Sequence, residues 1–126
     1  MQKISDAELE IMKIIWANQE KSTLFSYLMD KLADKGKPWQ KNTLITLLRR
    51  LINKGFLKAK KMGRRNEYIP LISEFEYQTA QTQNFLKKIY EGSVKGLVSN
   101  LISSDLLEND EYEELKTLLE KGKTKK

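Results

Sequence analysis

One stretch near the middle of the chain changes from a helical to a strand-like hydrophobic period, and this change restricts the fold more than any other feature. Between residues 40 and 54 the apolar residues recur at helical spacings and form one stripe: Leu44, Leu47, Leu48, Leu51 and Ile52. Gly55 follows the stripe, as expected at a helix end. Residues 57–61 then alternate apolar with cationic side chains, which predicts a strand. Residues 62–65 are predicted to form a turn, and residues 67–69 the second, returning strand. The sequence thus predicts a helix with one buried face, followed directly by a two-stranded hairpin.

Two further helices are expected before this stretch. The first begins at Ser5 or at the next residue, has Glu8 at the capping-box spacing from Ser5, and ends at Asn18. The second begins at residues 22–23 and is stopped by Gly36. Three helices followed by a hairpin are the order of elements in a winged helix-turn-helix.

The second half of the chain is expected to be helical throughout. Residues 73–90, 94–102 and 109–119 carry helical apolar spacings, and Gly92 and residues 103–105 interrupt them. The fold class is therefore mainly α: an N-terminal winged helix-turn-helix with a small β-hairpin wing, followed by a set of short helices.

We predict a domain boundary after residue 72, with residues 1–72 forming the winged domain and residues 73–126 a helical dimerisation domain. The C-terminal apolar residues would either close over the winged domain in a monomer or pack against a second copy. Three short helices make a thin core alone, which favours a homodimer. The residues expected in the dimer interface are Leu86, Ile89, Leu97, Val98, Leu101, Leu115 and Leu118.

Charge separates the same two halves. The net charge of +6 divides into +8 for residues 1–72 and −2 for residues 73–126. A basic half joined to a mildly acidic half indicates that only the first half binds a polyanion.

The polar side of the predicted third helix carries the residue types that read DNA bases. Asn pairs with adenine, Thr offers a hydroxyl and a methyl group, and Arg takes guanine or phosphate. The residues expected in the major groove are Asn42, Thr43, Ile45, Thr46 and Arg49. Those expected at DNA phosphates, on this helix and on the hairpin, are Lys41, Arg50, Lys60, Lys61, Arg64 and Arg65. For a single helix a solvated face is the simpler interpretation, and the cationic hairpin beside it favours nucleic-acid binding.

Missing residue types exclude several other functions. The chain has no Cys and no His, so it lacks thiolate metal ligands, disulfides and the commonest catalytic base. We expect no enzyme, no metal and no cofactor. The N-terminal segment lacks the pattern of a signal peptide, and the apolar runs are too short to cross a membrane, so we expect a cytoplasmic protein without membrane contact.

Other functions remain open at this level. A winged helix also serves as an adaptor, with a basic wing docked on an acidic protein partner. A nonspecific DNA-packaging protein would show the same cationic surface. A hydrolase or nuclease would need a catalytic base that the sequence does not reveal.

Three segments resemble a known family: ISDAELEIMKIIW, WQKNTLITLLRRLINKGFL with the hairpin after it, and FLKKIYEGSVKGLV. They resemble the penicillinase and methicillin-resistance repressors of BlaI/MecI type, a group that includes copper-responsive repressors of CopY type. The similarity extends over about residues 4–120. It implies a transcriptional repressor that binds a palindromic operator as a homodimer and blocks polymerase, in an antibiotic-resistance system. The relatives' operator sequence is not carried over to this chain, and an inverted repeat of TACA/TGTA type is the first candidate.

The resemblance also implies a mode of control and shows some departures. In the penicillinase branch a membrane sensor triggers proteolysis in the dimerisation region, and the family's cleaved bond falls here on Asn100–Leu101. Relatives commonly read W-S-P-K-T where this chain has Gln40 and Lys41 after the Trp, and Ile45 stands where relatives often carry Arg or Gln. The paired cysteines of the copper-responsive members are absent, which excludes copper sensing by that route.

Overall fold

The computed structural model describes residues 1–122, and the chain divides into two compact units, Met1–Gln81 and Thr82–Lys126. The division lies inside a helix, because the first turns of that helix pack into the first unit. The domain boundary expected after residue 72 stays a prediction, and the last four residues of the expected second domain lie outside the described part.

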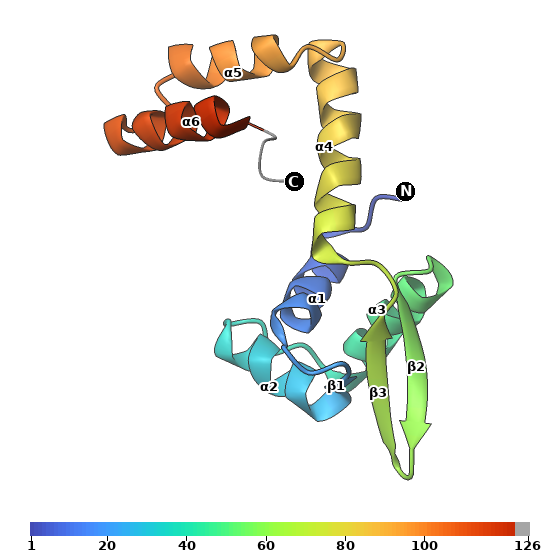
Figure 1. Cartoon of the computed structure of the whole chain (residues 1–126). Helices are drawn as coiled ribbons and strands as arrows, with labels where there is room; N and C mark the ends of the chain where they lie inside the picture. Colours follow the sequence, from blue (N-terminus) through green and yellow to red (C-terminus); the bar gives the residue numbers. More distant parts are fainter. Residues whose placement is uncertain (123–126) are drawn as a thin grey trace. The chain divides into compact units, whose positions relative to one another are not determined.

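The first unit contains three helices, a small sheet and the start of a fourth helix (Figure 1). In chain order these elements are α1 (Asp6–Ala17), β1 (Thr23–Leu24), α2 (Phe25–Asp34), α3 (Lys41–Asn53), β2 (Leu57–Met62), β3 (Arg65–Pro70) and α4 (Glu74–Tyr90). The second unit contains the end of α4 together with α5 (Val94–Ser103) and α6 (Asn109–Lys121). The mainly helical fold and its winged helix-turn-helix are confirmed.

The predicted helix ends are confirmed where a specific cap was expected. The side chain of Ser5 accepts a hydrogen bond from the backbone N–H of Glu8, and Glu8 accepts one from the backbone N–H of Ser5. The same reciprocal pair joins Ser73 and Glu76 at the start of α4. Gly36 follows α2 with φ of 75°, a value that a residue without Cβ adopts at little cost.

The start of the second helix was predicted wrongly. Thr23 and Leu24 form β1, which pairs antiparallel with Tyr68 and Glu67 of β3. Thr23 is buried, and its hydroxyl accepts a hydrogen bond from the Asn18 side chain. These pairings satisfy the backbone in an extended conformation, so α2 begins only at the next residue.

The predicted two-stranded hairpin is therefore part of a three-stranded sheet of order β1-β3-β2. In the hairpin, Met62 pairs with Arg65, which leaves a two-residue loop of Gly63 and Arg64. Gly63 has φ of 64°, and glycine at the first loop position is the pattern of a type II′ turn. The turn carries the chain back so that cationic residues lie on both sides of it.

One hydrophobic core fills the first unit. Apolar side chains from α1, α2 and α3 pack against Phe56, Leu57 and Tyr68 at the sheet. Full burial of one such side chain stabilises the folded state by about 1.5–3 kcal/mol. The core residues are Ile4, Ile11, Met12, Ile14, Ile15, Leu28, Leu32, Leu44, Leu47, Leu48, Leu51, Phe56, Leu57, Tyr68 and Tyr77.

Aromatic contacts attach the first turns of α4 to this core. The ring of Tyr77 lies 5.8 Å from that of Trp16 and 5.5 Å from that of Phe56, measured between centroids. The indole N–H of Trp16 also donates to the carbonyl of Ile72, at 2.9 Å. Tyr77 is the buried residue of α4, so these contacts explain why the compact unit extends beyond the sheet.

The second unit differs in having no buried side chain among residues 82–122. Its large apolar residues include several that are around half exposed or more: Phe85, Ile89, Val94, Ile102, Leu106, Tyr112, Leu118 and Leu119. Such a surface is unusual for a protein that remains a monomer in water. In residues 1–122 no helix combines the length and the apolar character needed to cross a bilayer.

Candidate nucleic-acid interface

Burial of one side of α3 determines which residues lie on its other side. Leu44, Leu47, Leu48 and Leu51 are buried, and the predicted groove residues Asn42, Thr43, Thr46 and Arg49 are exposed, with Ile45 half-buried at the edge. Lys41 and Arg50 are exposed on the same helix. The helix thus presents Asn42, Thr43, Thr46 and several cations to solvent, as the sequence predicts.

Thr46 has a defined orientation on this face. Its hydroxyl donates to the backbone carbonyl of Asn42, one turn earlier, at 3.0 Å. The proton of the hydroxyl is thus used within the helix. The methyl group and the acceptor lone pairs of the hydroxyl oxygen are the parts of Thr46 that are free for a new contact.

The cations beside α3 are not neutralised by acids. Lys60 and Lys61 lie on β2, Arg64 in the turn and Arg65 at the start of β3, and all four are exposed. None of the predicted phosphate residues forms an ion pair within residues 1–122. The acid of the hairpin, Glu67, instead accepts a hydrogen bond from the Ser22 hydroxyl at 2.6 Å.

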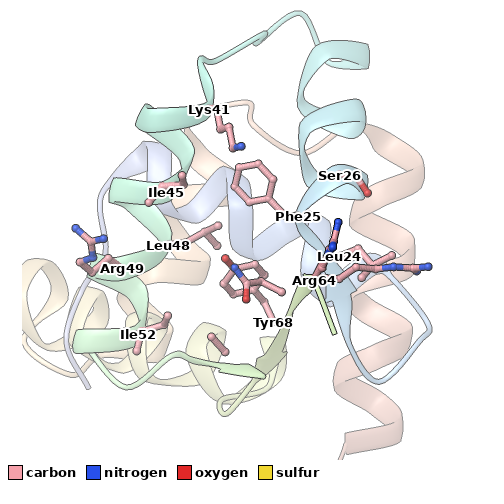
Figure 2. A pocket seen from close by; sticks show the side chains of 13 residues that line it. Leu24, Phe25, Ser26, Lys41, Ile45, Leu48, Arg49, Ile52, Arg64 and Tyr68 are labelled. Atoms are coloured by element: carbon pink, nitrogen blue, oxygen red, sulfur yellow. The ribbon is translucent and has the colours of Figure 1, made fainter. Parts of the chain in front are cut away.

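A groove brings part of both predicted sets together (Figure 2). It has a volume of about 490 Å³ and lies between the start of α2, one edge of α3 and the hairpin. Figure 2 shows Ile45, Leu48 and Ile52 on one side and Leu24 and Phe25 on the other. The predicted site residues that line it are Lys41, Ile45, Arg49, Arg64 and Arg65. Asn42, Thr43, Thr46, Arg50, Lys60 and Lys61 are not part of this lining.

Sequence reasoning did not find the other half of this groove. Leu24, Phe25 and Ser26 line it because β1 places the start of α2 beside β3, and the sequence pattern had suggested a longer helix there. Tyr68 lines it from β3, where burial raises the pKa of its phenol above the ordinary value. The sequence signal for β1 was Thr23 in the Ser22-Thr23 pair, because threonine favours strands and this one lies beside a helix start.

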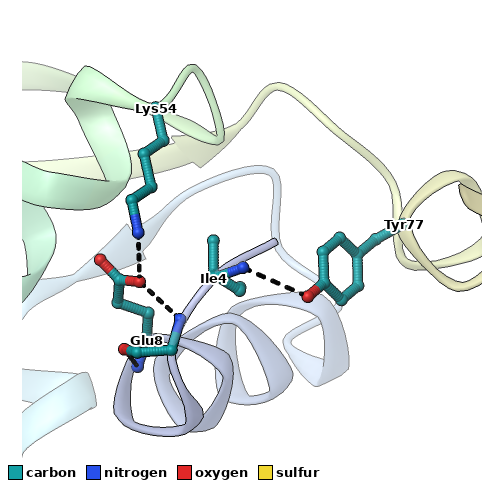
Figure 3. Close-up of polar contacts among 5 residues, drawn as sticks. Ile4, Glu8, Lys54 and Tyr77 are labelled. Carbon is teal, nitrogen blue, oxygen red and sulfur yellow. Dashed lines mark hydrogen bonds and ion pairs between the residues drawn. The ribbon is translucent and has the colours of Figure 1, made fainter. Parts of the chain in front are cut away.

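An ion pair anchors the other end of α3 (Figure 3). Glu8, only 1% exposed, accepts a hydrogen bond from the ammonium group of Lys54, the C-cap residue of α3, at 2.7 Å. The same carboxylate oxygen accepts from the backbone N–H of Ser5. Burial raises the pKa of Glu8, but the bonds from Lys54 and Ser5 outweigh it, so the pKa lies below its ordinary value. The start of α1 thereby holds the end of α3. Figure 3 also shows the hydrogen bond from the backbone N–H of Ile4 to Tyr77.

The residues predicted for a dimer interface lie in the second unit. Leu86, Leu97, Val98, Leu101 and Leu115 are half-buried, while Ile89 and Leu118 are 56% and 68% exposed. At the predicted cleavage position, Asn100 is exposed and Leu101 half-buried, both inside α5.

The helix order, the sheet and the cationic hairpin define a winged helix-turn-helix protein. Comparison with known proteins identifies its family: the family model for the penicillinase repressor matches residues 4–121. The chain belongs to the penicillinase repressor family, which confirms the resemblance inferred from the sequence. The penicillinase repressor of Bacillus licheniformis is 38% identical over 124 residues, covering 98% of this chain and 94% of the relative. The methicillin resistance regulatory protein MecI of Staphylococcus aureus strain N315 is 34% identical over 119 residues, covering 94% of each.

Solved structures of relatives match the winged part. The solution structure of the DNA binding domain of the repressor BlaI has a TM-score of 0.51 and 42% identity, covering 61% of this chain and 94% of that one. The solution structure of the monomeric form of Bacillus licheniformis BlaI in complex with the blaP half-operator has a TM-score of 0.50 and 41% identity, covering 60% and 89%.

Replacement of Glu8 by Gln tests the anchor of α3. At pH 7 we expect the free energy of unfolding to fall by about 1.5–3 kcal/mol, the range for hydrogen bonds to charged groups. Because the pKa of Glu8 is lower in the folded state, its contribution is present above the ordinary value of 4.5 and is lost as the pH falls through the folded value. Urea unfolding from pH 7 to pH 3 should show the two proteins converging below pH 4.5.

A matched control for this series is Glu20→Gln, which removes an exposed carboxylate and should change stability by less than about 0.5 kcal/mol. Equal stability of the parent and the Glu8 variant at pH 7, or a difference that does not change with pH, would contradict the assignment.

Proposed function

We propose that the chain is a sequence-specific DNA-binding transcriptional repressor that acts in the cytoplasm and catalyses no reaction. The observation that carries this proposal is the exposed face of α3, with Asn42, Thr46 and Arg49, beside a hairpin of unpaired cations. Membership of the penicillinase repressor family supports it, as does the similarity to a BlaI structure in complex with a half-operator.

In this proposal α3 enters the major groove and the hairpin contacts the backbone. The major groove of DNA admits an α-helix, and the base edges in it differ for all four base pairs. The contacts to bases would come from Asn42, Thr43, Ile45, Thr46 and Arg49. The contacts that supply affinity and register without reading sequence would come from Lys41, Arg50, Lys60, Lys61, Arg64 and Arg65. Occupation of the operator would block polymerase.

A homodimer would present two such units to a palindrome. The absence of a buried side chain in residues 82–122, together with the exposed Ile89 and Leu118, supports a partner on the second unit. A second copy would place two recognition helices about one DNA turn, roughly 34 Å, apart.

Proteolysis at Asn100–Leu101 would split α5 and separate α6 from the rest of the chain. The backbone carbonyl of Asn100 accepts hydrogen bonds from the hydroxyl of Ser104, at 2.6 Å, and from its N–H, at 3.0 Å. A protease that needs an extended substrate would therefore act only after α5 opens locally. A sensor-activated protease is the partner that this control requires.

Selection from a pool of randomised duplexes tests the proposed function without assuming an operator. We expect the full chain to enrich an inverted repeat, with TACA/TGTA-type half-sites as the first candidate, because a dimer reads two symmetric half-sites. The selected duplex should bind about 10³-fold more tightly than a shuffled one in fluorescence anisotropy at physiological salt. A nonspecific packaging protein would bind both equally, and an adaptor would bind neither.

Two substitutions separate the methyl of Thr46 from its hydroxyl. Because the hydroxyl proton is held by the Asn42 carbonyl, we expect the methyl to make the base contact. Thr46→Val keeps that methyl and should retain operator affinity within about twofold, whereas Thr46→Ser should lose about 1 kcal/mol, mostly at one base pair per half-site. Anisotropy with single-base variants of the selected operator measures both. The opposite ranking would assign the contact to the hydroxyl.

Replacement of Arg64 by Gln should weaken binding to every duplex alike. A phosphate contact releases counterions, so the slope of log affinity against log salt should become shallower by about 1. Lys13→Gln is the control, since Lys13 is an exposed cation of α1 that lies outside the interface. A change in base preference with an unchanged slope would show that Arg64 reads bases instead.

Replacement of Leu118 by Gln should weaken the dimer. Each protomer of the dimer loses one buried leucine, so the loss of about 1.5 kcal/mol counts twice and the dimer dissociation constant should rise about 100-fold. Sedimentation equilibrium measures this directly, and Lys116→Gln on the same helix is the control. If both variants associate as the parent does, Leu118 is not in the interface.

A further inference from the structure

The groove between α2, α3 and the hairpin has a composition that phosphate contacts do not require. Its floor includes Leu48 and Tyr68, which are 1% and 6% exposed, and its walls carry Phe25, Ile45 and Ile52. Contacts to a DNA backbone need cations and polar groups at the rim, not an apolar floor with two aromatic rings. A concave apolar site with a few polar groups at its edge is instead the form of a small-molecule site.

The charge around the groove is of one sign. Lys41, Arg49, Arg64 and Arg65 line it, and no acidic residue is part of its lining. Figure 2 shows Lys41 and Phe25 facing each other from α3 and α2. An occupant therefore needs an apolar body for the floor and a negative group for the rim.

We propose that this groove binds a small amphiphilic anion, a molecule with an aromatic or branched apolar body and one carboxylate or similar acidic group. The volume of about 490 Å³ lies within the range of small-molecule sites, roughly 300–1,000 Å³. The rings of Phe25 and Tyr68 offer flat surfaces for the body, and the rim cations offer charge-assisted hydrogen bonds to the acid.

Binding would act on the proposed function through shared residues. Ile45 and Arg49 line the groove and belong to the predicted base contacts, and Lys41, Arg64 and Arg65 line it and belong to the predicted phosphate contacts. An anion on these cations competes with DNA for the same charges. This regulatory step rests on the proposed function, whereas the binding step does not.

The site is tested with the full chain and 2-naphthoate as the probe, followed by amide chemical shifts in two-dimensional NMR. We expect saturable shifts concentrated at Phe25, Ile45, Ala59 and Tyr68. 2-Naphthamide, which has the same rings without the charge, should bind about tenfold more weakly, as expected for loss of a charged hydrogen bond. Three results would overturn the site: shifts confined to residues 82–122, equal affinity for the amide, or no binding of naphthoate at a concentration of about 10 mM, which detects weak ligands.

Filling the groove provides a variant that leaves the charges and the predicted DNA contacts unchanged. Ala59 is an exposed residue of β2 that lines the groove, so Ala59→Leu should reduce naphthoate affinity several-fold. Ala17→Leu, at the exposed end of α1, is the matched control and should have no effect. Equal naphthoate affinity in both variants would contradict the proposed location.

Competition with DNA separates the two proposals. At a naphthoate concentration ten times its dissociation constant, the apparent dissociation constant for the selected operator should rise about tenfold. If the operator binds specifically and naphthoate in the groove leaves that affinity unchanged, the regulatory step is wrong and the proposed function stands. If naphthoate occupies the groove and no duplex is preferred, the binding site stands and the proposed function fails.

Discussion

Burial of the leucine stripe of α3 is the constraint on which the rest of the structure depends. Leu44, Leu48 and Leu51 are at most 1% exposed, and each contributes about 1.5–3 kcal/mol by leaving water. A rotation of α3 about its axis would expose these side chains, so the polar face has one accessible orientation. The core thereby determines which residues of α3 lie on its exposed face.

The position of α3 along its axis depends on polar contacts as well. Glu8 caps α1 and holds Lys54 at the end of α3, so one buried carboxylate joins the ends of two helices. The second oxygen of Glu8 is buried without a partner in the described structure. The negative charge of the Glu8 carboxylate is therefore stabilised by the hydrogen bonds that its first oxygen accepts from Lys54 and Ser5. At the other end, the start of α3 borders the groove through Lys41. The helix is therefore fixed by an apolar stripe along its length and by an ion pair at one end.

Much of this arrangement could be predicted from the sequence, because it follows from local patterns. The leucine period predicted α3, and the Ser5 capping box predicted the start of α1 within one residue. The outward placement of Asn42, Thr46 and Arg49 follows from the helical period alone.

The features that escaped prediction depend on contacts between distant segments. Thr23 becomes a strand residue because Tyr68 pairs with it, and the Glu8–Lys54 pair joins residues 46 positions apart. The aromatic side of the groove exists only once β1 has placed α2 beside β3. In the second unit the apolar spacing predicted the helices correctly, but it carries no information on packing between chains.

Replacement of thymine by uracil, one position at a time in the selected operator, tests most directly whether α3 reads bases in the major groove. Uracil lacks only the methyl group that thymine presents in that groove, and it leaves the phosphates unchanged. With Ile45 at the edge of the face and the Thr46 methyl free, affinity should fall by about 1 kcal/mol at one or two symmetric thymines per half-site and remain constant elsewhere. A flat profile at every thymine would contradict the account, because it would mean that the helix does not contact the bases through these side chains.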